Sequence, residues 1–150
     1  MNFEDVAKRL SREHFELDVR MKHLLECVDF MPRTNESNWI DECRATYSEF
    51  REHLHRHMDL EEAGGYLANV IERRPGLASE VERLQREHHS LRYLIDSLAD
   101  AVSVMTAAEP LRIRDCCHRV RDLISYIRHH EHDENMTVLS AFTDDIGTKD

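Results

Sequence analysis

Residues that break regular structure are scarce in this sequence, since its 150 residues include only 4 Gly and 3 Pro. This scarcity argues against a small β-sandwich or barrel, which needs many turns, and a charged fraction of 33% is typical of long helices. The length suits one domain, because a chain of this size buries about 68–70% of the surface that its unfolded form exposes. We therefore predict a single all-α domain with a substantial core.

Positive charge is also in short supply. The chain has 20 Lys and Arg against 30 Asp and Glu, a formal net charge of −10 with neutral His. Because an acidic surface repels phosphate backbones and anionic lipids, we expect neither nucleic acid nor membrane as a partner. The sequence has no apolar run of roughly 18–20 residues and no signal-peptide pattern at its start, which predicts a cytoplasmic protein. Its oligomeric state is left open.

The four cysteines form no CxxC pair, and two of them are adjacent in sequence: they are Cys27, Cys43, Cys116 and Cys117. This spacing suggests neither a zinc ribbon nor a disulfide framework. We predict reduced cysteines that are mostly structural.

Three breaks divide the chain into four long segments. The breaks are residues 31–35, the stretch from Gly64 to Gly76, and residues 106–110. They predict helices near residues 3–29, 37–63, 78–105 and 110–140, with Ser37 as the N-cap of the second and Pro110 in the first turn of the fourth. Residues 66–73 are a candidate short helix. A domain of residues 1–142 is expected to precede a polar, frayed tail over residues 143–150.

Apolar residues recur every three or four positions in each segment, as the buried stripe of an amphipathic helix requires. The stripes of the first and third segments match at an offset of 74, and those of the second and fourth at an offset of 73. The four stripes are Leu10, His14, Leu17, Met21, Leu24, Val28; Phe50, Leu54, His57, Glu61; Leu84, His88, Leu91, Ile95, Leu98, Val102; and Leu123, Ile127, His130, Glu134. A helix pair that occurs twice favours an up-down-up-down four-helix bundle.

Each stripe also contains polar side chains, which are costly in a core unless something satisfies them. The second and fourth stripes each hold an HxxxE pair, whose two side chains share a helix face about 5–6 Å apart. Independent core histidines have no reason to fall at matching positions of both halves. Imidazoles and carboxylates at one level of a bundle predict a site for first-row transition metals. The predicted ligands are His14, His57, Glu61, His88, His130 and Glu134.

These motifs resemble the hemerythrin-like family, whose HHE cation-binding domains carry His on the first and third helices and HxxxE on the second and fourth. The resemblance covers residues 8–140. It implies a non-haem centre of two iron ions, oxo- or hydroxo-bridged, with the four His as terminal ligands and Glu61 and Glu134 as bridges. The same ligands would accept zinc or manganese in a given preparation.

The sequence departs from the oxygen-carrying members of that family at one position. The third helix of those members carries an HxxxH motif, whereas in this sequence Arg92 stands four residues after His88. The implied ligand set then leaves coordination positions open on the metals. His53, one turn before His57, is an additional candidate ligand, with a proton-relay role beside the metals as the alternative.

Two further polar positions have open interpretations. Asp18 and Arg92 occupy matching positions of the repeat, and they either form an ion pair across the bundle or are two solvated charges. Glu62 points about 100° away from Glu61 on its helix, which favours a place at the surface or beside the ligands over a ligand role.

Open positions on iron favour a module that binds or senses a small ligand, such as dioxygen, nitric oxide, peroxide or the redox state, with iron storage as a further use. An enzyme that acts on peroxide or nitric oxide at the same centre is the alternative. A metal-free bundle, such as a histidine phosphotransfer domain, would leave the doubled HxxxE unexplained.

Overall fold

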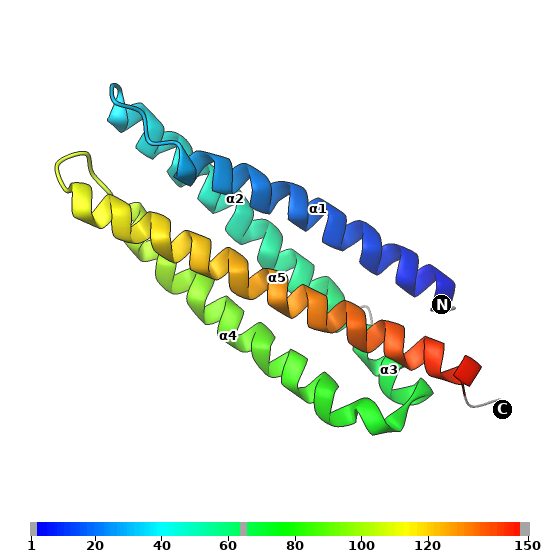
Figure 1. Ribbon diagram of the computed structural model, residues 1–150. Helices are drawn as coiled ribbons and strands as arrows, with labels where there is room; N and C mark the ends of the chain where they lie inside the picture. The colour runs from blue at the N-terminus through cyan, green and yellow to red at the C-terminus, as the bar shows by residue number, and fades with distance from the viewer. Residues whose placement is uncertain (1–2, 64–65, 148–150) are drawn as a thin grey trace.

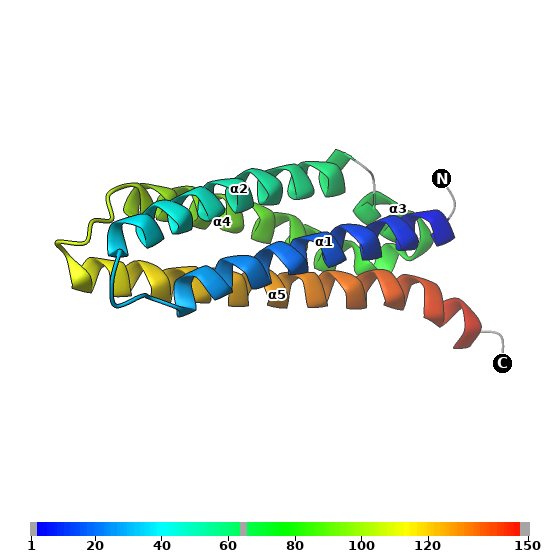
Figure 2. The ribbon, with the colours of Figure 1, turned by 90° about the horizontal axis from the view of Figure 1, so that it is seen from above.

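The computed structural model describes residues 3–63 and 66–147. Its elements are α1 (Phe3–Asp29), α2 (Glu36–Ala63), α3 (Tyr66–Arg73), the short 3-10 helix η1 (Pro75–Leu77), α4 (Ala78–Ser103) and α5 (Pro110–Gly147), with no strand in the described ranges. The long helices α1, α2, α4 and α5 run alternately in opposite directions side by side (Figure 1 and Figure 2). The predicted all-α four-helix bundle and the short extra helix are confirmed.

One predicted helix cap and one predicted helix end were wrong. α2 begins at Glu36, so Ser37 lies inside its first turn and is not the N-cap. Asn35 precedes the helix with φ of 60°, a conformation that Asn tolerates, and its carbonyl accepts a hydrogen bond from the Trp39 N–H at 3.2 Å. α5 continues to Gly147 because no Pro follows Pro110, so residues 143–147 of the expected tail are helical. Residues 148–150 lie outside the described residues.

The core consists of two apolar clusters with a polar layer between them. Every residue of the four predicted stripes is buried. On α1, His14 separates Leu10 of the smaller cluster from Leu17 of the larger one. On α4, His88 occupies the same place between Leu84 and Leu91. The histidines therefore lie at one level inside the bundle, covered by apolar side chains above and below.

The short helix α3 closes one end of the bundle, beyond the polar layer (Figure 1). Its buried side chains Tyr66, Leu67 and Val70 belong to the smaller cluster, together with residues of α1, α4 and α5. Without α3, the polar layer would lose part of the apolar cover that separates it from solvent.

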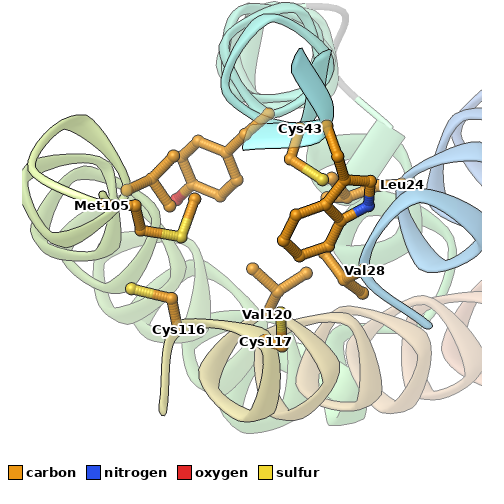
Figure 3. A pocket seen from close by; sticks show the side chains of 10 residues that line it. Leu24, Val28, Cys43, Met105, Cys116, Cys117 and Val120 are labelled. Atoms are coloured by element: carbon orange, nitrogen blue, oxygen red, sulfur yellow. The ribbon is translucent and has the colours of Figure 1, made fainter. Parts of the chain in front are cut away.

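The larger cluster encloses a cavity of about 10 Å³, lined in part by Cys43, Cys116 and Cys117 (Figure 3). That volume is at the limit for one water molecule. All four cysteines are free, and burial raises the pKa of Cys43 to about 12, so this thiol stays protonated and packs as a small apolar group. No helix in the described part of the chain is long and apolar enough to cross a membrane.

Candidate metal centre

Six buried side chains from four helices converge in the polar layer. In one group, ligand atoms of Glu61, His88, His130 and Glu134 all lie within 4.8 Å of one another, and in the other the same holds for His14, His57 and Glu61. These are the six residues predicted from the stripes. The spacing of four residues places each HxxxE pair on one face of its helix, and the antiparallel packing brings the four faces together.

The two carboxylates lie between the two pairs of histidines. Glu134 Oε1 lies 3.6 Å from His14 Nε2, whereas its Oε2 lies 3.1 Å from His130 Nε2. Glu61 is arranged the same way, since its Oε1 contacts His57 Nε2 and its Oε2 lies 3.9 Å from His88 Nε2. Each carboxylate therefore turns one oxygen toward each half of the bundle, which is the arrangement that a bridge between two cations requires.

The inward atoms of this cluster lack hydrogen bonds. None of the four Nε2 atoms of His14, His57, His88 and His130 makes an aligned hydrogen bond with a described residue, and the same is true of both oxygens of Glu134. A buried polar atom without a partner costs about 1–3 kcal/mol, more when it is charged. Cations placed between these atoms would satisfy all of them, so the residues present fit a metal centre.

The outward nitrogens of His14 and His88 have partners from the opposite half of the bundle. His14 Nδ1 lies 2.9 Å from Asn135 Oδ1, and His88 Nδ1 lies 3.0 Å from Glu62 Oε1. Asn135 and Glu62 each directly follow the Glu of an HxxxE motif. Such a bond holds the proton on Nδ1 and leaves the Nε2 lone pair pointing inward, as a metal ligand needs. The prediction that Glu62 lies beside the ligands is confirmed.

The Glu residues of the repeated Arg-Glu-His sequence lie beside the other two histidines. His130 Nδ1 lies 2.8 Å from Glu87 Oε1 in a hydrogen bond. His57 Nδ1 lies 3.8 Å from Glu13 Oε2, too far for a hydrogen bond, and has no hydrogen-bond partner among the described residues. Each Glu-His dipeptide thus supplies one candidate ligand and a carboxylate beside a histidine of the neighbouring helix. Sequence reasoning missed these roles of Glu13 and Glu87, although the literal repeat was the available signal.

The charges in the cluster are strongly coupled. Burial and the neighbouring His14 lower the pKa of His57 to about 3, so this imidazole is neutral. Burial and the nearby Glu134 raise the pKa of Glu61. Burial opposes charge on His130 too, but contact with Glu134 and Glu87 raises its pKa overall. The cluster therefore holds protons between its carboxylates and imidazoles, which a metal ion would displace.

Three other predicted positions lie outside the cluster. His53 is buried but belongs to neither group of converging ligand atoms, and burial together with Arg20 and Arg56 lowers its pKa. The suggested ion pair between Asp18 and Arg92 is wrong.

Both residues have other partners. Asp18 lies 3.0 Å from Lys22, and Arg92 lies 2.7 Å from Asp59. These partners come from the same or an adjacent helix, so neither side chain has to cross the bundle.

Two side chains near the cluster, Glu131 and Tyr66, were missed from sequence. Glu131 Oε1 lies 3.9 Å from His14 Nε2, and burial raises the pKa of Glu131 to about 7. The signal was its spacing of three residues from Glu134, which places both on one side of α5. Tyr66 is buried at the start of α3, and its hydroxyl has no hydrogen-bond partner among the described residues. The sequence predicted a short helix here but gave no role to Tyr66.

The bundle and the converging ligands define a helical cation-binding protein. Comparison with protein families agrees, because the profile of the hemerythrin HHE cation-binding domain matches residues 5–142. The chain belongs to this family. No curated protein and no solved structure matched the chain.

Proposed function

We propose that this cation-binding domain holds two metal ions, iron in its working form, and that it binds or senses a small ligand there. The observation that carries the proposal is the orientation of Glu61 and Glu134, whose paired oxygens face both sets of histidines. A single ion would use only one oxygen of each carboxylate well. Two ions about 3.5–4 Å apart, the separation of known two-metal sites, would use both.

The residues divide between the two ions by their positions. His14 and His57, with ring centroids 5.3 Å apart, would hold one ion, and we call them the α1–α2 half of the site. His88 and His130, with centroids 4.8 Å apart, would hold the other and form the α4–α5 half. Imidazole nitrogen and carboxylate oxygen suit iron, and they also accept zinc, manganese and cobalt.

The surroundings of the site favour a small ligand. The six ligands are buried, and a groove of about 310 Å³ between α1 and α5 reaches His14 from the surface. Iron held at such a site supplies reversible redox chemistry and affinity for dioxygen, nitric oxide and peroxide. The chain contributes the apolar cover above and below the ligands, which keeps bulk water and larger molecules away.

Metal analysis after reconstitution with Fe²⁺ under nitrogen tests the proposal. We expect two ions per chain, fewer in His57→Ala, and two again in His132→Ala, a matched control because His132 is exposed on α5. One ion or none in the wild type would contradict a dinuclear centre.

An optical spectrum during exposure to oxygen, followed by a steady-state peroxide assay, tests the type of function. A stable spectral change without turnover supports a binding or sensing role. Sustained peroxide turnover would contradict it and favour the enzyme alternative.

A further inference from the structure

We propose that Glu131 is a seventh protein ligand of the centre and binds the ion held by His14 and His57. This inference rests on the proposed dinuclear site. It assigns one of the coordination positions that the six other ligands leave open, and it makes the two ions chemically unequal.

The position of Glu131 directs it to the α1–α2 half, although it lies on α5. It directly follows His130 in sequence, yet its Oε1 lies 3.9 Å from Nε2 of His14. The same Nε2 atom lies 3.6 Å from Glu134 Oε1. Glu131 belongs to neither group of converging ligand atoms, but Glu131 and Glu134 both place an oxygen beside Nε2 of His14, an arrangement that suits a cation.

The surroundings of Glu131 Oε1 also favour a cation. Its side chain is only 12% exposed, and Oε1 has no hydrogen-bond partner among the described residues. Other carboxylates around the centre have partners, since Glu62 and Glu87 accept from histidine Nδ1 atoms. A buried carboxylate oxygen without a partner costs free energy, and an ion at His14 and His57 would offset that cost.

The repeat shows that this ligand exists in one half only. The residue equivalent to Glu131 on α2 is Met58, a fully buried apolar side chain that belongs to the larger cluster. The α4–α5 half therefore has no matching carboxylate within the described residues.

Competition titration with Co²⁺ on Glu131→Gln and Glu131→Ala tests this assignment, with Glu62→Gln as the matched control. Gln keeps the shape of the side chain but is a poor ligand. We expect wild type to bind two ions and both Glu131 variants to bind one of them at least about 100-fold more weakly, beyond the 10–100-fold typical of residues that only orient a ligand. Acetate should restore the second ion in Glu131→Ala and have no effect on Glu62→Gln.

Thermal melting of the metal-free proteins supplies a second readout. Glu131→Gln should melt at or above the wild-type temperature, because it replaces a carboxylate whose Oε1 is buried without a partner, and it should gain less from added Co²⁺. Unchanged affinity for both ions in Glu131→Gln, absence of acetate rescue, or a lower metal-free melting temperature would overturn the inference. A wild type that binds fewer than two ions would instead refute the proposed dinuclear centre.

Discussion

The two halves of the site present the same ligands but surround them differently. In each half, one histidine follows a Glu on α1 or α4, and the other begins an HxxxE motif on α2 or α5. Behind His14, however, stands the neutral amide of Asn135, whereas the carboxylate of Glu62 stands behind His88. Glu62 therefore places a negative charge behind His88, whereas the group behind His14 is neutral.

The comparison shows how a duplicated scaffold becomes an asymmetric site. The stripe residues are buried in the core, and their packing requires similar residues in both halves. The candidate ligands on the stripes are therefore alike in both halves too. The residues beside the stripes are less constrained by packing. Glu131 and Met58 occupy equivalent positions of the repeat, and so do Asn135 and Glu62. Each half therefore has one additional carboxylate in a different place, Glu131 beside His14 Nε2 and Glu62 beside His88 Nδ1.

The largest effect is expected from the carboxylates that both halves share. Replacing Glu61 by Ala should remove at least one of two ions, because this side chain would contribute a bond to each. Glu134→Ala should lose as much. Iron content per chain measures both, with the exposed Glu52→Ala on α2 as the control. Retention of two ions in Glu61→Ala would show that the halves do not depend on a common bridge.

Metal removal is expected to have the next largest effect. Ions that bind only the folded state stabilise it by about 4 kcal/mol at a concentration of 1,000 times the dissociation constant, or about 10 °C in melting temperature for a chain of this length. Melting curves with and without chelator measure the shift. His57→Ala and His130→Ala should each lose part of the rise in melting temperature that metal binding causes. The two losses show how much each half of the site contributes to this rise. Equal melting temperatures in the wild type would contradict a filled site.

Exchange of the outer partners tests the asymmetry directly. Glu62→Gln should lower the affinity for the ion of the α4–α5 half by about 10–100-fold, the range for residues that orient a ligand. Asn135→Asp should raise the affinity for the ion of the α1–α2 half and so make the affinities of the two halves more alike. Chelator competition measures both. An unchanged ratio of the two affinities would show that these partners do not distinguish the halves.

The smallest effect is expected at His53. His53→Ala should retain both ions, because the side chain lies outside both ligand groups, while the reaction with peroxide or nitric oxide changes if this imidazole relays protons. Its repeat counterpart Tyr126 is exposed, so Tyr126→Phe serves as the control. Loss of one ion, to the same extent as in His57→Ala, would show that His53 is itself a ligand.

The sequence by itself determined the bundle and the six converging ligands. Helical periodicity places residues three and four apart on one face, and burial of that face is the main source of stability, so the stripes could be identified from the order of residues alone. The repeat then marked His14 and His88 as related positions. The same local logic identified α3 and the first residue of α5, Pro110.

Only the tertiary structure decided which residues beside the stripes face the centre. Glu131, Asn135 and Glu13 lie at the borders of their helix faces, where a small rotation of the helix turns a side chain toward the ligands or toward solvent. Their partners lie on neighbouring helices, so spacing within one helix can mark these residues as candidates but cannot identify the contact. The start of α2 likewise depends on the left-handed conformation of Asn35. A single Asn tolerates this conformation, but the sequence does not impose it. Helix faces follow from local periodicity, whereas contacts between helices depend on how the packed helices are rotated against one another.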